Sequence, residues 1–220
     1  MEKNKQYNII ILGPQGSGKG SQAILLAENF NFVHIETGKI FRKMAKTNTP
    51  LGIKINNLIN IKGSLVNDDL VMKVLIKSLS KVPKKDGLLF DGFPRTLNQA
   101  KGLDKIFETI NRELTHVIYM PIKKATTLKR LTRRRTCDKC GKIFISGVNI
   151  KSSVTKCPVC KGKIIQREDD KPKAILKRLD IFNKQTKPII NYYIKRGLVI
   201  KVDGEPTIKQ VYKVVLRILK

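Results

Sequence analysis

Two kinds of hydrophobic pattern alternate along the chain. Short continuous apolar runs, such as residues 7–12, are typical of strands buried on both faces of a sheet, whereas apolar residues three or four positions apart are typical of amphipathic helices. The continuous runs predict strands at 7–12, 32–35, 87–91, 115–120 and 198–202. The helical spacing predicts helices at 19–29, 51–61, 68–80, 123–135, 172–197 and 208–219, with one more that ends at Met44 and one that begins at Thr96. Strands that alternate with helices predict an α/β fold, with a parallel sheet whose ligand site lies at the carboxyl ends of the strands.

Polar residues mark where two of these helices begin. Thr96 and Gln99 have the spacing of a capping box, in which each side chain binds the other residue's backbone N–H. Asp169 and Asp170, followed by Pro172 in the first turn, are expected to start the long helix over 172–197.

A glycine-rich segment follows the first strand directly. It reads Gly-Pro-Gln-Gly-Ser-Gly-Lys-Gly-Ser from Gly13 to Ser21, and a helix is predicted to begin at Lys19. The backbone N–H groups of such a turn form a nest for anions, and the helix N-terminus adds a partial positive charge. Lys19 can then reach the β- and γ-phosphates of a nucleotide, and the Ser21 hydroxyl is available to Mg²⁺. The strict P-loop pattern has Ser or Thr directly after the lysine, where this chain has Gly20.

An acidic residue and several scattered cations extend this phosphate chemistry. Asp91 ends a predicted strand and is expected to bind Mg²⁺ through water; a mere helix or turn cap is the less favoured alternative. Phosphoryl transfer needs positive groups around the moving phosphoryl, and arginine grips phosphate oxygens with two nitrogens. Taken singly, each arginine is better explained as a solvated surface residue. The candidate cations are Lys19, Arg42, Arg95, Arg130, Arg134, Arg167 and Arg178.

The cysteines are all found in one part of the chain. Cys137, Cys140, Cys157 and Cys160 form two Cys-x-x-Cys pairs with sixteen residues between them, which is the spacing of a structural zinc ribbon. Four thiolates leave no open position on the metal, so the predicted role is structural. Two disulfides, or iron in place of zinc, are alternatives. The ribbon interrupts the strand–helix alternation, which indicates an insertion into the sheet domain, with short strands at 142–145 and 163–166.

Composition and charge narrow the classes of function. The 220 residues can form a full α/β core, and no apolar stretch is long enough to span a membrane. The chain has no secretory signal at its start, which favours the cytoplasm. The net charge of +28 would suit a nucleic-acid-binding protein with a zinc ribbon, and that hypothesis remains open. The low aromatic content of 6% offers no platform for base stacking and is evidence against it.

Taken together, these segments resemble the adenylate kinase family, in its long form with a zinc-binding lid, over essentially the full length of the chain. The residues that carry the resemblance are Gly16–Ser21, Thr37 and Gly38 with Arg42, Gly63–Val66, Asp91–Thr96 with Gln99, Arg130–Arg135, the four cysteines, Arg167–Asp170 and Lys177–Leu179. The resemblance implies a P-loop NTPase-type parallel sheet with a helical AMP-binding insertion and a small zinc-ribbon lid. It also implies a monomer that transfers a phosphoryl group reversibly from Mg·ATP to AMP, giving two ADP and so maintaining the balance of adenine nucleotides, with no nucleic-acid or membrane partner.

The same resemblance implies a division of the chain. Residues 1–36, 67–129 and 168–220 would form the core, 37–66 the AMP-binding segment and 130–167 the lid that closes over ATP.

The resemblance also implies roles for individual residues. The expected ATP site is Gly16, Ser17, Gly18, Lys19, Gly20, Ser21, Arg130, Arg134, Ile143, Phe144 and Pro206. The expected AMP site is Thr37, Arg42, Ser64, Leu65, Val66, Gly92, Phe93, Pro94, Arg95, Gln99, Arg167 and Arg178. Lys19, Arg95, Arg134, Arg167 and Arg178 would be catalytic, and Ser21 and Asp91 would hold Mg²⁺ through water. The carboxamide of Gln99 matches the N6/N1 side of adenine. A related kinase that uses GTP as donor, or UMP or CMP as acceptor, remains an alternative.

Two positions depart from the family pattern. Lys39 stands where an acidic residue is usual, which puts the local salt bridges in doubt. Arg133 replaces a usual glycine and adds a cation near the expected ATP site.

Overall fold

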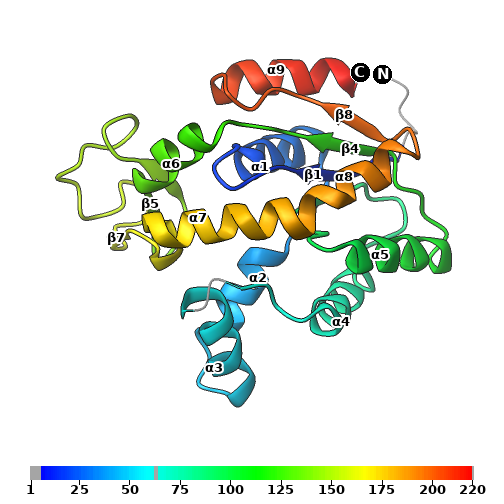
Figure 1. The fold of residues 1–220 in the computed structure, drawn as a ribbon, viewed down its shortest axis with the longest axis horizontal. Helices are drawn as coiled ribbons and strands as arrows, with labels where there is room; N and C mark the ends of the chain where they lie inside the picture. Colours follow the sequence, from blue (N-terminus) through cyan, green and yellow to red (C-terminus); the bar gives the residue numbers. More distant parts are fainter. Residues whose placement is uncertain (1–5, 62–63, 220) are drawn as a thin grey trace.

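The computed structural model describes residues 6–61 and 64–219, so Gly63 and the outermost residues of the expected core lie outside the described residues. Its centre is a parallel sheet of five strands in the order β2-β3-β1-β4-β8 (Figure 1). The strands are β1 (Asn8–Leu12), β2 (Val33–Glu36), β3 (Leu88–Asp91), β4 (His116–Tyr119) and β8 (Val199–Lys201). Every strand predicted for this sheet is present, which confirms the α/β fold.

The central strand β1 explains why the sheet is covered on both faces. All five of its residues are buried, and Ile10 lies opposite Phe90 of β3 and Val117 of β4. Because side chains alternate along a strand, Ile9 and Ile11 enter one core and Ile10 and Leu12 the other. A strand with two buried faces reads as a continuous apolar run, which is the pattern seen in the sequence.

Helices form one layer on each side of the sheet. α1 (Lys19–Phe30) and α9 (Ile208–Ile218) supply Leu26 and Val215 to one core. α4 (Asp68–Leu79), α5 (Leu97–Thr109) and α8 (Lys187–Ile194) supply Leu75, Leu103 and Tyr193 to the other. Figure 1 shows α9 above the strands and α4 and α5 below them, with α2 (Thr37–Met44) and α3 (Pro50–Asn56) extending downward.

The cysteine-containing segment folds as a separate small sheet. β5 (Arg134–Cys137) pairs in antiparallel fashion with β6 (Ile143–Ile145) and β7 (Ile164–Ile165), beyond the ends of α6 (Lys124–Thr132) and α7 (Pro172–Ile181) (Figure 1). The helix predicted over 123–135 was wrong at its end, because the backbone at Arg134 and Arg135 pairs with β6. The expected short strands at 142–145 and 163–166 are present as β6 and β7.

Two predicted helices contain a π-helical turn. The helix predicted over 172–197 is composed of α7, a π-helical turn η3 (Phe182–Thr186) and α8, so the prediction of one regular helix was wrong. Pro188 in the first turn of α8 has no N–H for the regular ladder, and the wider turn precedes it. The helix predicted over 51–61 likewise becomes α3 followed by the π-helical turn η1 (Asn57–Ile61).

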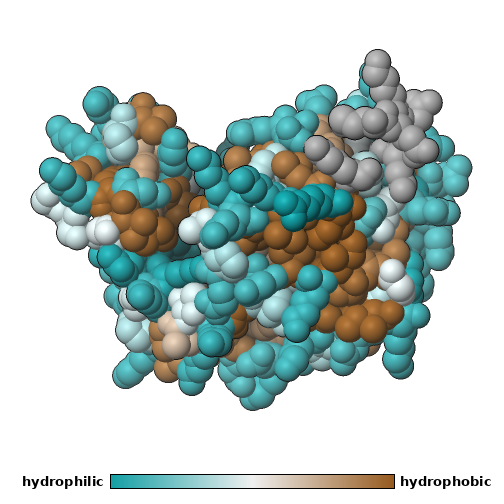
Figure 2. Space-filling view, turned by 90° about the horizontal axis from the view of Figure 1, so that it is seen from above, coloured by the Kyte–Doolittle hydropathy of each residue, from teal (hydrophilic) through white to brown (hydrophobic). Residues whose placement is uncertain are grey.

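Hydrophilic residues are distributed widely over the face that Figure 2 shows. In Figure 2 they surround several apolar patches. A separate lobe lies at the left, where Figure 1 places the cysteine-containing segment with β5 and β7, called the ribbon below. Among the described residues, no helix is both long and apolar enough to cross a membrane.

Candidate active site

A cavity opens at the carboxyl ends of β1 and β3. Its lining combines the phosphate loop, the start of α2, the turn after β3 and the junction of α7 with η3. The space that it encloses, open solvent included, is about 1080 Å³. The expected AMP-site residues that line it are Thr37, Arg42, Ser64, Leu65, Val66, Gly92, Pro94, Arg95, Gln99 and Arg178. Phe93 is completely buried and packs against Phe90 in the core, and Arg167 lies outside this lining.

The phosphate loop presents unused donors. Gly16 and Gly18 have φ of 84° and 90°, a left-handed conformation that glycine adopts without strain. α1 starts directly afterwards, at Lys19, whose Nζ donates to the Pro14 carbonyl at 3.2 Å. The buried polar atoms Nε2 of Gln15 and Oγ of Ser17 have no hydrogen-bond partner among the described residues. Buried donors are normally paired, so this loop fits an anionic ligand that would accept from it.

Cations crowd around Lys19. Burial lowers the pKa of Lys19 to about 8; Asp91 opposes this shift, and Arg95, Arg178 and Arg134 add to it. Burial likewise lowers the pKa of Arg95 to about 10, with further repulsion from Arg178. The point where the phosphate loop meets the cavity is therefore strongly electropositive, which suits a ligand with several negative charges.

Asp91 lies beside the first turn of α1. A Cβ added at Gly20 would come within 3.1 Å of the Asp91 Oδ2 atom, which gives a physical reason for glycine after Lys19. Ser21 follows on the same turn. A hydroxyl and a carboxylate are oxygen ligands of the kind that Mg²⁺ accepts directly or through water, so these residues fit that ion.

Two acidic residues hold two of the candidate arginines. Asp170 accepts from Nε and Nη2 of Arg134 at 2.8 and 2.6 Å, and Asp169 forms a 2.7 Å ion pair with Arg178. Although burial raises the pKa of Asp169, the arginines around it hold that pKa below its ordinary value.

The expected role of these aspartates as helix starters was wrong. They lie in a short 3₁₀ turn, η2 (Glu168–Asp170), and Lys171 is the residue that precedes α7.

Arg130 connects the phosphate loop to the segment before Pro206. Its guanidinium donates to the carbonyls of Gly16, Gly204 and Glu205 at 2.7–3.1 Å. Two parts of the expected ATP site that are far apart in sequence are thus joined by one side chain, and Pro206 itself is exposed next to them.

The ribbon residues expected near ATP differ in exposure. Ile143 is exposed, whereas Phe144 is buried in the ribbon's own core with Cys137 and Cys157. Arg167 donates from Nε to the Thr136 hydroxyl, and burial followed by repulsion from Arg134 lowers its pKa to about 10.

Of the two positions that depart from the family pattern, Arg133 has a local contact. Arg133 donates to the carbonyl of Ser146, so it packs against a turn of the ribbon. Near Lys39, Arg42 pairs with Glu36 at 2.8 Å, so the start of α2 does have a salt bridge.

The Thr96 and Gln99 pair forms only half of a capping box. The Thr96 hydroxyl accepts from the Gln99 N–H at 3.2 Å. The Gln99 carboxamide does not accept a hydrogen bond from the backbone N–H of Thr96, so the expectation of a full capping box was wrong. Its oxygen accepts from the Arg95 N–H at 2.8 Å, while its nitrogen donates to Asp68. Sequence reasoning missed Asp68 because it lies on α4, far from Gln99 along the chain.

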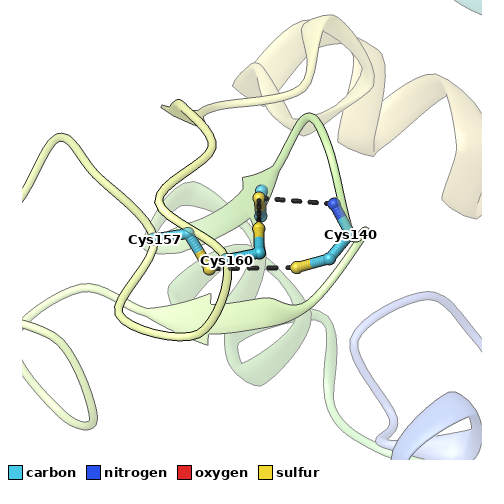
Figure 3. A group of neighbouring side chains, drawn as sticks. Cys140, Cys157 and Cys160 are labelled. Carbon is cyan, nitrogen blue, oxygen red and sulfur yellow. Dashed lines mark hydrogen bonds between the residues drawn. The ribbon is translucent and has the colours of Figure 1, made fainter.

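The cysteine sulfur atoms face one another. Their four Sγ atoms all lie within 4.8 Å of one another, and the Cys137–Cys160 and Cys140–Cys157 separations are 3.4 and 3.8 Å (Figure 3). A tetrahedral zinc with bonds of about 2.3 Å would separate its sulfur ligands by about 3.8 Å. Disulfide sulfurs lie about 2.05 Å apart. All four cysteines are free, so the arrangement fits a metal and excludes the disulfide alternative in this structure.

Comparisons with known proteins agree on one family. A model described as "Adenylate kinase" matches residues 11–198. An adenylate kinase of Clostridium botulinum (strain Hall) is 40% identical over 211 residues, covering 96% of this chain and 97% of that protein. An adenylate kinase of Thermosipho africanus is 39% identical over 97% of this chain and 99% of its own, and one of Methanocella arvoryzae is 41% identical over 92% and 93%.

These similarities extend over nearly the whole chain, and they agree with the parallel sheet, the phosphate loop and the cationic cavity. The chain therefore belongs to the adenylate kinase family, the nucleoside-monophosphate kinases that transfer a phosphoryl group from ATP to AMP to give two ADP.

Proposed function

We propose that the phosphoryl group is transferred at the electropositive point between the phosphate loop and the cavity. The observation that supports this most strongly is the crowding of Lys19, Arg95 and Arg178. Burial lowers the pKa of all three side chains, and the two arginines lower the pKa of Lys19 further. Such a group of cations is costly without a ligand, and two nucleotides that meet end to end would place their phosphates among them.

The donor nucleotide is assigned to the loop side of this point. The backbone of the phosphate loop and Lys19 would hold the ATP phosphates, and Arg134 would grip a phosphate oxygen. Arg130 and Pro206 would flank the adenine, since Arg130 is bound to the segment just before Pro206. From the ribbon, Ile143 offers an exposed side chain, whereas buried Phe144 could contribute only its backbone. The full proposed ATP set is Gly16, Ser17, Gly18, Lys19, Gly20, Ser21, Arg130, Arg134, Ile143, Phe144 and Pro206.

The acceptor nucleotide is assigned to the cavity. Gln99 and the segment Ser64–Val66 would bind the adenine of AMP, and Thr37 and Gly92 would lie along its sugar and phosphate. Arg42 and Arg95 would bind the AMP phosphate. Phe93 is a core residue that would support this wall from behind.

Catalysis by these residues rests on position and charge. Phosphoryl transfer requires little covalent help from a protein, so fixed cations around the moving group supply most of the effect. Asp170 holds Arg134 and Asp169 holds Arg178 in place, which reduces the reorganisation needed in the reaction. Lys19, Arg95 and Arg167 complete the proposed catalytic set.

Two metals are part of the proposal. Mg²⁺ would arrive with ATP and neutralise phosphate charge, while Ser21 and Asp91 hold its water ligands. Zinc would join the two Cys-x-x-Cys pairs, and four sulfur ligands would give it a purely structural role.

The proposed division of the chain assigns residues 130–167 as a lid over ATP, 37–66 as the AMP-binding segment and the remainder as the core. The ribbon has its own small sheet and its own buried cluster, which supports treating it as one unit. All assigned residues come from a single chain, so a monomer suffices.

The test is ³¹P NMR of the purified protein with Mg·ATP and AMP, beside a control without AMP. ADP that accumulates only when AMP is present supports the proposal. ADP and free phosphate in both samples would indicate a hydrolase and overturn it. Repeating the assay with CMP, UMP and GMP, and with GTP as donor, identifies the nucleotide pair, and turnover with every acceptor except AMP would overturn the assignment of the cavity.

A further inference from the structure

Asp68 forms a bridge between two residues at the edge of the cavity. It is the first residue of α4, and its two carboxylate oxygens accept from different side chains of the next segment. Oδ1 accepts from Nε2 of Gln99 at 2.6 Å, and Oδ2 accepts from the hydroxyl of Thr96 at 2.8 Å. On the opposite side, the backbone N–H of Arg95 donates to Oε1 of Gln99 at 2.8 Å. The Gln99 side chain is thereby held at both ends, and it is almost completely buried.

These partners allow only one orientation of the carboxamide. An ionised carboxylate can only accept hydrogen bonds, and a backbone N–H can only donate one. The nitrogen of Gln99 must therefore face Asp68, and its oxygen must face Arg95. A flipped amide would place oxygen against oxygen and N–H against N–H, leaving buried polar groups unpaired. In the fixed orientation, one N–H and one oxygen lone pair of Gln99, which lines the cavity, remain for a ligand.

We propose that Asp68 makes the cavity select 6-aminopurine over 6-oxopurine monophosphates. An adenine offers an N6–H donor and an N1 acceptor on one edge, and hypoxanthine offers the reverse pair, an O6 acceptor and an N1–H donor. The 6-amino base is satisfied by the fixed carboxamide, whereas the 6-oxo base requires the flipped one. Asp68 is thus a positioning residue that acts through Gln99, and this inference rests on the proposed placement of the AMP base at Gln99.

The sharpest variant is Asp68→Asn, which has nearly the same shape. Its side-chain amide can present either an N–H or an oxygen to Gln99, so the variant removes one of the two constraints on the carboxamide, and only the Arg95 N–H still opposes the flipped form. We expect the ratio of kcat/KM for AMP to that for IMP to fall by about tenfold, the effect of one hydrogen bond. Most of the change should be a gain with IMP. Asp68→Ser, whose hydroxyl also donates or accepts, is the second variant if Asp68→Asn fails to fold.

The matched control is Asp69→Asn. Asp69 lies in the same first turn of α4 and carries the same charge, but it is exposed and its side chain has no role in this bridge. The control removes the same favourable interaction with the helix N-terminus. We expect it to leave the AMP to IMP ratio as in the wild type.

Calorimetric binding of AMP and IMP to the same proteins keeps this inference separate from the proposed reaction. A wild-type protein that binds AMP but fails to phosphorylate it would overturn the reaction, and the ratio of the two dissociation constants would still test Asp68. A ratio that falls in Asp68→Asn but not in Asp69→Asn is the expected result. Equal losses for both nucleotides in Asp68→Asn, with the ratio unchanged, would overturn the inference.

Discussion

The guanidinium of Arg134 binds the carboxylate of Asp170 through two hydrogen bonds, of 2.8 Å from Nε and 2.6 Å from Nη2. Arg134 belongs to the ribbon and Asp170 to the turn that leads back into α7. The side chain of Asp170 is completely buried, so this pair is largely shielded from water.

Asp170→Ala should therefore lower the free energy of unfolding by about 3–5 kcal/mol, the usual effect of leaving a buried charge unpaired. Urea denaturation measures it. Glu168→Ala is the control. Glu168 forms an ion pair with Lys171 in which the two side chains are 63% and 64% exposed, so the pair lies in water. We expect that control to change stability by less than about 1 kcal/mol. Equal losses in the two variants would show that burial of the Arg134 pair has no special weight.

Lys19→Ala should reduce kcat by about 10²–10³, as for removal of one preorganised charge partner. The buried ammonium lies at the phosphate loop, where its Nζ donates to the Pro14 carbonyl. Steady-state assays of ADP formation measure the effect. Lys101→Ala, which removes an exposed lysine of α5, should leave kcat unchanged. A Lys19→Ala enzyme with more than a tenth of the normal kcat would contradict the assigned role.

Binding of ATP should weaken as pH rises through about 8, because burial lowers the pKa of Lys19 to about 8. Below that pH the side chain is an ammonium ion that attracts phosphate, and above it the amine is neutral. A bound phosphate favours the charged form, so the affinity should fall by up to tenfold for each pH unit above about 8. Calorimetry between pH 7.5 and 9.5 measures the slope.

Lys19→Arg supplies the control for this titration. A guanidinium remains charged across the range, so its slope should be close to flat. Identical slopes in the two proteins would assign the pH dependence to another group.

Cys137→Ser should lower thermal stability more than it lowers activity at low temperature. The serine oxygen is a poor replacement for a thiolate ligand, and the ribbon around it has only a small buried cluster of its own. Thermal melts and initial rates at 15 °C measure the two effects. A chelator applied to the wild-type protein should act in the same way, and added Zn²⁺ should restore the wild type but not the variant. Loss of activity in proportion to stability at every temperature would indicate that the metal takes part in the chemistry.

The strands β1 and β3 were the most predictable part of the sheet because both are buried on both faces. Such strands appear as apolar runs with no polar residue at the centre, as in Ile9–Leu12. The strand β5 was not predictable in this way. Its sequence, Arg-Arg-Thr-Cys, has no apolar alternation, and it is a strand because its backbone pairs with β6 and β7.

The candidate site was predictable where a local motif carries the chemistry, as in the phosphate loop and the cysteine pairs. The acidic partners were not. Asp170 and Asp68 read as ordinary helix-starting residues, and their contacts with Arg134 and Gln99 span 36 and 31 residues. Contacts of that separation depend on how the helices pack, which no local pattern reports.

The crowding of cations around Lys19 also links the lifetime of the protein to its supply of substrate. In the empty protein, Arg95 and Arg178 repel Lys19, so folding pulls like charges together. A nucleotide binds only the folded chain, and at a hundred times its dissociation constant it adds about 2.7 kcal/mol to the free energy of unfolding. In a cell depleted of nucleotides, a larger fraction of the molecules would be unfolded and accessible to proteases. The abundance of the enzyme would then fall with the concentration of its nucleotide substrates.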